Sequence, residues 1–307
     1  MSLDALVAWD DPTNVPLLQN FRSYGQELKQ TFFDQPNVGR MAAPYVKPAA
    51  FDGITEHETT TYDDVDDVEY GMVPGESNTD LQGDTVKTKM PQIYKTARDL
   101  VDNWRRAFGP SNQGRQPILM GRLRQKVLNK EDYIIFNGDL KESIEGMVAA
   151  GHGITTAGSW ATADSQGIRT NMKKDFYNIR NYFSNVGLGK YKIDYFITYP
   201  AYDLMDDVDL GARASSMMDL ITGKSYFGEL MPSNNVRPEA PVDGKNVLIG
   251  IPRVEVSEAF WGLISSGIED EALRDSLWTW IYGIREKFSV EFVLPQYIAV
   301  VEDITLV

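Results

Sequence analysis

The chain has 307 residues, a formal net charge of −14 at pH 7 and no cysteine. The length predicts one large domain or two smaller ones, and the negative charge argues against a protein that coats itself in nucleic acid. The lack of cysteine excludes disulfides, thiolate nucleophiles and cysteine-ligated metals, and it fits assembly in the cytoplasm.

Recognisable motifs for chemistry are scarce. The two histidines, His57 and His152, have no second histidine at metal-binding spacing, so we interpret them as exposed loop residues. The glycines of residues 187–191 are too close together for a Walker loop. The sequence contains no apolar run of about 18 residues, so it predicts no membrane span, and the N-terminus lacks a signal-peptide pattern. We therefore expect no catalytic residue, cofactor, metal or membrane contact.

The first hundred residues predict an arm followed by a hairpin. Residues 1–51 contain five prolines and one amphipathic stretch, at 16–33, which is typical of an extended arm that packs on something else. Two alternating segments, 54–64 and 84–97, flank the turn-rich stretch 71–83 and predict a long two-stranded hairpin. A lone hairpin is barely stable in water, so it should lie against a partner.

The next segment predicts a short helix and then a long one. Residues 98–109 read as a helix that ends at Gly109-Pro110. A helix of about 20 residues follows, with Pro117 in its first turn, and it ends at Asn137-Gly138, where left-handed backbone is needed. We call it the spine helix. It combines two stripes: apolar Met120, Leu123, Val127 and Ile134, and basic Arg122, Lys126 and Lys130.

Beyond residue 150 the pattern mixes helices and strands. Residues 167–187 predict a helix with Phe176, Ile179 and Phe183 inward, and 191–200 predict a central strand. Two short helices or turns come next, and strands meeting near Pro252 follow them. Residues 277–307 are rich in β-branched and aromatic residues and predict two or three strands. Their alternating aromatic side chains are more typical of a core than of a ligand platform.

Charge is unevenly distributed along the hairpin and the spine helix. Residues 52–84 carry eleven acids and no Lys or Arg, whereas residues 87–130 carry eleven bases and two acids. Three interpretations compete: two solvated faces, a calcium site in 63–69 that lacks the glycine of an EF-hand loop, and complementary surfaces of neighbouring subunits. Which of these three interpretations holds depends on the architecture of the folded protein.

The order of these elements resembles the Hong Kong 97-type capsid fold, shared by major capsid proteins of tailed double-stranded DNA viruses and by encapsulin shells. The resemblance lies in "MPQIYKTARDLVDNWRRAFG" (90–109), "GRLRQKVLNKEDYIIFNGD" (121–139), "IEGM" (144–147) and "YGIREKFSVEFVLPQYIAVV" (282–301). It rests on the order of elements across most of the chain rather than on one sharp motif. It implies an α+β fold with an N-terminal arm, an extended loop, a spine helix, and peripheral and axial domains.

This resemblance also implies an organisation and a function. It divides the chain into the arm (1–51), the extended hairpin loop (52–97), the peripheral domain with the spine helix (98–154), the axial α/β domain (155–250) and the return strands of the peripheral domain (251–307). We expect a structural, non-enzymatic virion protein, assembled in the host cytoplasm, whose pentamers and hexamers enclose DNA without sequence-specific contacts. A scaffold, portal or decoration protein is a possible partner.

An encapsulin that packages a cargo enzyme is the second interpretation within the same fold. A hydrolase using paired carboxylates is a less favoured one from another class, because 44 acidic residues offer many pairs. If subunits assemble, the acids of the hairpin should meet bases of the next chain. The predicted contacts join Asp63, Asp64, Asp66, Asp67 and Glu69 to Arg98, Arg105, Arg106, Arg122, Lys126 and Lys130.

Overall fold

The computed structural model describes ten segments of the chain: residues 38–43, 46–48, 56–62, 83–100, 115–160, 165–207, 217–236, 245–254, 260–276 and 279–306. They form two compact units. Of the described residues, the first unit contains those within 92–129 and 267–286, and the second contains the others. Helices and strands are both abundant, which confirms the predicted α+β class. Within the described segments, no helix is long and apolar enough to cross a membrane.

A five-stranded mixed sheet lies at the centre of the second unit. Its order is β7 (His152–Ile154), β14 (Ala299–Ile304), β10 (Asn246–Pro252), β8 (Ile193–Ile197) and β9 (Phe227–Pro232). The middle strand β10 is antiparallel to both neighbours, and the two outer pairs are parallel. Every residue of β8 and β10 is buried, as expected for strands covered on both faces. The predicted central strand is therefore confirmed.

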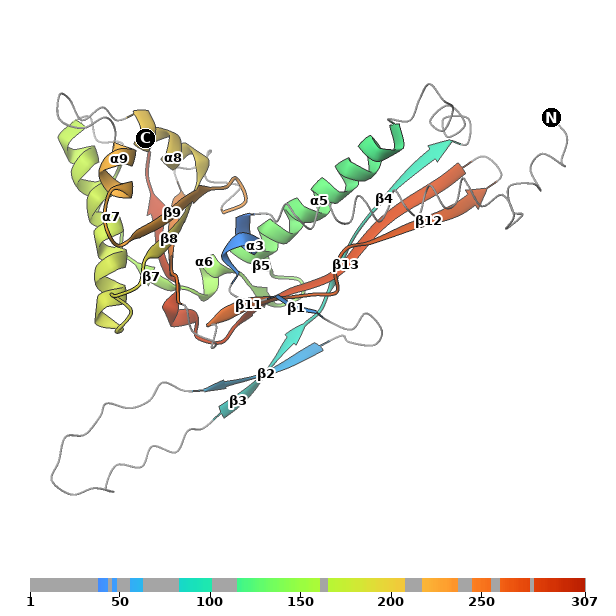
Figure 1. Ribbon diagram of the computed structural model, residues 1–307, viewed down its shortest axis with the longest axis horizontal. Helices are drawn as coiled ribbons and strands as arrows, with labels where there is room; N and C mark the ends of the chain where they lie inside the picture. The colour runs from blue at the N-terminus through green and yellow to red at the C-terminus, as the bar shows by residue number, and fades with distance from the viewer. Residues whose placement is uncertain are drawn as a thin grey trace, which may run out of the picture. The chain divides into compact units, whose positions relative to one another are not determined.

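Helix α7 (Ser165–Asn185) runs along this sheet, with α8 (Tyr199–Asp207) and α9 (Met217–Thr222) near it (Figure 1). Its inward side chains recur at helical spacing, which places them on the face toward the strands. Phe176, Ile179 and Phe183 are all 1% exposed or less, which confirms the predicted helix and its inward face. They share one apolar core with residues of β8, β10 and β14.

The predicted hairpin is confirmed where the structure describes it. Strands β2 (Glu56–Tyr62) and β3 (Gly83–Lys89) pair antiparallel along their full length. The prediction of one continuous strand over 84–97 is wrong, because β3 ends before Met90-Pro91 and a separate strand, β4 (Gln92–Leu100), follows. Proline has no N–H to donate, so a ladder is readily interrupted there.

Strand β4 also corrects the predicted helix at 98–109. Residues 98–100, the first three of that predicted helix, belong to β4, and β4 pairs with the long strand β13 (Thr279–Phe292). The rest of that predicted helix lies outside the described residues. In the first unit, β12 (Glu269–Ser276) is antiparallel to the N-terminal half of β13.

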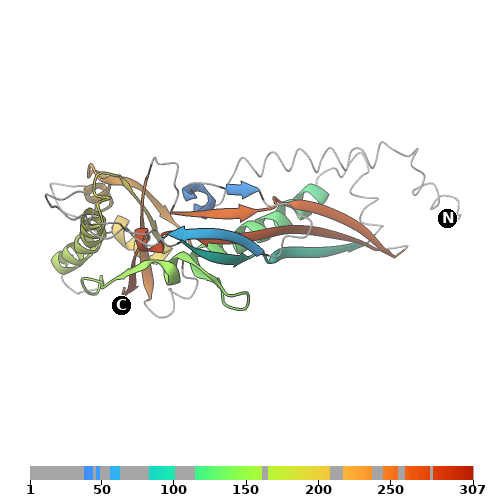
Figure 2. The ribbon, with the colours of Figure 1, turned by 90° about the horizontal axis from the view of Figure 1, so that it is seen from below.

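In the second unit, the C-terminal half of β13 pairs antiparallel with β11 (Trp261–Ser265). The short strand β1 (Val46–Pro48) adds to the other edge of β11 in parallel (Figure 2). Phe288 and Val290 of β13 are buried, which agrees with a core role for the alternating apolar residues. The 3₁₀ turn η1 (Pro295–Tyr297) connects β13 to β14, and β14 pairs with β10, so the last strand lies in the sheet of β8 and β10. The five segment boundaries stay a prediction.

The spine helix is α5 (Arg115–Asn137), and it ends at the predicted position. Gly138 has φ +75°, the left-handed conformation that glycine adopts without steric penalty. The chain then forms a tight hairpin, in which β5 (Gly138–Asp139) pairs with β6 (Ile144–Glu145) before the single-turn helix α6 (Met147–Ala150). A Cβ at Gly138 would overlap the carbonyl oxygen of Ile144. The glycine therefore serves the geometry of the helix end, as the sequence predicts.

Candidate functional site: the two faces of the spine helix

Burial divides the spine helix into two faces. Leu123, Val127 and Ile134 of the predicted apolar stripe are 5%, 1% and 2% exposed. The predicted basic residues Arg122, Lys126 and Lys130 are all exposed, one helical turn apart. Gln125 and Asn129 are exposed too, and Gln125 donates a hydrogen bond of 3.1 Å to Asn129, whereas Arg124 is buried. The helix thus presents a basic and polar face, which we call the basic stripe, and buries the opposite face.

One end of the basic stripe is held in place. The ammonium group of Lys130 lies 3.6 Å from a carboxylate oxygen of Asp139, beyond the end of the helix. It also lies 4.7 Å from the centre of the Tyr133 ring, within range of a cation–π contact. Partly exposed pairs of this kind contribute only about 0–1 kcal/mol to stability. These contacts of Lys130 therefore contribute little to the stability of the fold.

The structure brings together three of the predicted contact residues, namely the members of the basic stripe. The acidic residues Asp63, Asp64, Asp66, Asp67 and Glu69 and the bases Arg105 and Arg106 lie outside the described residues, and the side chain of Arg98 on β4 is not described. Contacts between the two sets stay a prediction.

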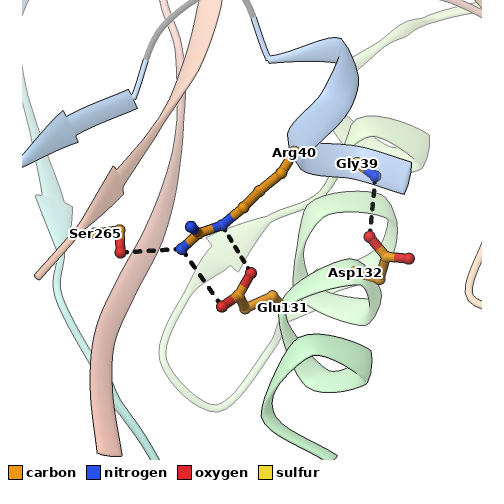
Figure 3. A network of polar contacts seen from close by, with 5 residues as sticks. All are labelled: Gly39, Arg40, Glu131, Asp132 and Ser265. Atoms are coloured by element: carbon orange, nitrogen blue, oxygen red, sulfur yellow. Dashed lines mark hydrogen bonds and ion pairs between the residues drawn. The ribbon is translucent and has the colours of Figure 1, made fainter. Parts of the chain in front are cut away.

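A second polar feature, missed by the sequence, lies at the buried end of the spine helix. We call it the arm clasp, and it consists of Gly39, Arg40, Glu131, Asp132 and Ser265 (Figure 3). The short helix α3 (Val38–Ala42) supplies the first two, the spine helix the next two and β11 the last. All five belong to the second unit.

Arg40 is the central residue of the clasp. Its Nε lies 2.9 Å from Oε2 of Glu131, and its Nη2 donates to the other carboxylate oxygen at 3.4 Å and to the hydroxyl of Ser265 at 3.0 Å (Figure 3). The side chain of Glu131 is fully buried and that of Arg40 is 11% exposed. Two-point contacts between guanidinium and carboxylate are strong and directional. One arginine therefore joins α3 to both the spine helix and β11.

Asp132 holds the start of α3. Its Oδ1 accepts a hydrogen bond of 2.9 Å from the backbone N–H of Gly39, one of the N–H groups that lack a partner inside a short helix. Burial is the main cause that raises the pKa of Asp132, and the bonds from Gly39, Asn235 and Val38 oppose it. The backbone of α3 also approaches closely, since a Cβ at Gly39 would lie 2.6 Å from Cδ1 of Ile135.

The sequence of the spine helix does contain a signal for this clasp. Glu131 and Asp132 are the two acidic residues of an otherwise acid-free helix over 115–137. Adjacent acids in a basic helix indicate a local partner, but the sequence does not say which one. Arg40 lies 91 residues away from Glu131, and only folding brings them together.

A buried carboxylate also organises the loop before α7. Asp175 of α7 accepts hydrogen bonds from the backbone N–H of Ala157 at 2.6 Å, from the Thr156 hydroxyl at 3.1 Å and from Nε1 of Trp160 at 2.8 Å. Asp175 and Trp160 are both fully buried. Burial, the largest influence, raises the pKa of Asp175 despite these three donors. The cluster fixes the loop before α7 and has no feature of a reaction centre.

A cavity of about 460 Å³ lies in the second unit between α3 and the central sheet. Phe260, Trp261 and Ile251 give it apolar walls, and Asp194 and Glu229 add carboxylates. Both carboxylates bind Arg253, whose Nε lies 2.5 Å from Asp194 and whose Nη2 lies 2.7 Å from Glu229. Asp194 and Glu229 therefore form one ion-paired cluster with Arg253.

Comparison with known proteins identifies structures that share the fold of this chain. No protein-family model matches the sequence, and no curated protein matches it. The virus-like particle protein from Pyrococcus furiosus is similar in structure, with a TM-score of 0.64 and 8% identity over 92% of this chain and 99% of that one. The capsid protein of Myoviridae phage XM1 gives a TM-score of 0.60 and 9% identity over 84% and 89% of the two chains.

An encapsulin is similar as well. The shell protein in the holo-SrpI encapsulin complex from Synechococcus elongatus PCC 7942 gives a TM-score of 0.56 and 11% identity, over 88% of this chain and 91% of that one. Because these matches span nearly the whole length of each chain, they define one shared architecture. The protein has the Hong Kong 97-type fold of phage capsids and encapsulins, as the order of its elements predicts.

Proposed function

We propose that the protein is a structural subunit that assembles with copies of itself into a closed icosahedral shell, and that this shell is a viral capsid around double-stranded DNA. The observation that carries the proposal is the extent of the similarity. It covers 92% of this chain and 99% of the virus-like particle protein, at a TM-score of 0.64. Similarity over a whole subunit includes the elements through which such subunits meet.

The basic stripe supports a specific mode of association. Arg122, Lys126 and Lys130 are exposed on one helical face, and the acidic residues 63–69 belong to the connection between the paired strands β2 and β3. In the proposed shell, the acidic segment of one subunit lies across the basic stripe of the next. Each exposed pair contributes about 0–1 kcal/mol, so the contacts select register and orientation more than they add affinity.

Charge pairing makes assembly sensitive to salt. At about 0.15 M ionic strength the Debye length is about 8 Å, and at 1 M it is about 3 Å. Shell formation should therefore weaken as salt rises above physiological strength. A structure in which residues 63–69 bind only within their own chain would contradict this mode of association.

An encapsulin shell that encloses a cargo enzyme is the second candidate. The similarity to the SrpI encapsulin complex, at a TM-score of 0.56, favours it as a specific alternative. The contents of the shell distinguish the two, because a capsid holds nucleic acid and an encapsulin holds protein.

In either role the protein has no catalytic task of its own. As a capsid protein it resides in the virion after assembly in the host cytoplasm, and a scaffold, portal or decoration protein is its natural partner. Sedimentation of the purified protein, alone and with a co-expressed scaffold, tests the proposal. We expect particles far larger than the 34.5 kDa chain. A stable monomer under every condition would overturn it.

A further inference from the structure

We propose that helix α3 is a latch: it detaches from the spine helix and docks again while the rest of the second unit stays folded. In the docked state the arm clasp holds it, and in the detached state the clasp residues face water. This inference concerns the subunit itself and does not require the proposed shell.

The first observation is that polar contacts, not apolar burial, dominate the attachment of α3. The helix has five residues, and Gly39 is the buried one among them. Of its two larger apolar side chains, Met41 is 61% exposed and Val38 is only partly buried. Single-turn helices are not stable alone in water, so α3 depends on the groups that hold it.

The second observation is that the attachment converges on very few groups. Glu131 and Ser265 bind the guanidinium of Arg40, and Asp132 binds the N–H of Gly39. The ring of Phe288 on β13 lies 5.8 Å from the same guanidinium. Loss of the Arg40–Glu131 ion pair therefore removes a charged contact between α3 and the spine helix, which favours a two-state opening over gradual fraying.

The third observation is the contrast with the adjacent sheet. Every residue of β8 and β10 is buried, and these strands share the large apolar core with α7. Local opening requires the least free energy where few apolar contacts must be broken. The latch and the sheet should therefore open independently, at different rates.

Opening also changes the cavity described above. Met41, Ala42 and Ala43, at the C-terminal end of α3, form part of its wall, opposite the buried side chain of Trp261. Detachment of α3 removes that wall and exposes the apolar side of the cavity to solvent. The state of the latch is thus coupled to the surface that the subunit presents.

Hydrogen exchange of the full-length chain, measured by mass spectrometry, tests the latch. We compare the wild type with Glu131→Gln and with Glu142→Gln, a matched change at an exposed acid in the β5–β6 turn. A hydrogen bond to a charged group is worth roughly 1.5–3 kcal/mol, so exchange over 38–43 should become about 10–100-fold faster in Glu131→Gln. Exchange in β8 and β10 should not change, and Glu142→Gln should match the wild type.

A double-mutant cycle shows whether Arg40 and Glu131 act as one pair. If they do, Arg40→Gln and Glu131→Gln each accelerate exchange over 38–43, and the double variant accelerates it no more than either alone. Additive effects would overturn the proposal. So would acceleration that spreads equally to β8 and β10, or a wild-type rate over 38–43 equal to that of β10, because α3 would then open only when the unit unfolds.

Discussion

Replacing Asp175 with Asn removes one carboxylate oxygen from a fully buried site with three donors. Both Trp160 Nε1 and the Thr156 hydroxyl donate to Oδ2, at 2.8 Å and 3.1 Å. An amide oriented to keep the Ala157 bond places its NH2 group against these two donors. The substitution therefore leaves at least one buried donor without an acceptor.

The size of the effect follows from these bonds. An unsatisfied buried donor costs roughly 1–3 kcal/mol, and the lost bonds to a charged acceptor add to this. Removing the buried charge offsets part of the loss, because burial raises the pKa of Asp175 and so disfavours its ionised form. We expect a net loss of about 2–3 kcal/mol, or roughly 4–10 °C in the midpoint of thermal unfolding.

Thermal unfolding of the unassembled subunit, followed by circular dichroism, measures this loss. Asp203→Asn on the exposed side of α8 is the matched control and should change stability by less than about 0.5 kcal/mol. Equal midpoints for Asp175→Asn and the control would refute the assigned role of the cluster.

The pH dependence provides a second check with a defined sign. Because the pKa of Asp175 is raised above 3.8 in the fold, the stability linked to its proton is fully present below pH 3.8. That stability is lost as the pH rises through the raised pKa, whereas the Asn variant has no such dependence. The stability gap between wild type and Asp175→Asn should thus be wider below pH 3.8 than at pH 7. A gap that closes in acid would show that burial is not the dominant influence.

Two further variants test the spine helix. Gly138→Ala should destabilise the subunit by roughly 2 kcal/mol or more, since it adds a clash with Ile144 to a strained φ of +75°. The control Gly187→Ala, at φ +81° with open space around it, should cost only about 1 kcal/mol in thermal unfolding, and equal losses for the two variants would contradict the role of the clash. Changing Arg122, Lys126 and Lys130 together to Gln should leave the circular dichroism spectrum and unfolding midpoint of the subunit nearly unchanged, because exposed charges contribute little to stability. The same triple variant should assemble poorly at low salt in light scattering, and an unfolded variant would show that the stripe is structural instead.

The spine helix and the central sheet could be predicted because local pattern and final burial agree there. The apolar stripe of Leu123, Val127 and Ile134 is buried as its spacing indicates, and Gly138 ends the helix for a purely local backbone reason. Strand β8 is apolar except for Asp194, whose carboxylate pairs with Arg253, and this composition suits a strand that is buried on both faces. In these places the sequence alone contains the needed information.

Prediction failed where tertiary contacts override local preference. The helical spacing within 98–109 predicts a helix, yet the start of this stretch extends β4, whose pairing with β13 connects residues far apart in the sequence. The arm clasp is invisible for the same reason, since Arg40 and Glu131 meet only in the folded chain. Sequence periodicity reports which face is buried, but not which distant charge lies against it.

Electron microscopy of the purified full-length protein, expressed with and without a scaffold partner, tests the central claim most directly. We expect closed icosahedral shells hundreds of ångströms across, in which each subunit shows the spine helix and the β2–β3 hairpin of the single chain. Nucleic acid inside would identify a viral capsid, and a protein cargo would identify an encapsulin. Monodisperse particles of 34.5 kDa in every preparation would contradict the proposal that this chain builds a shell.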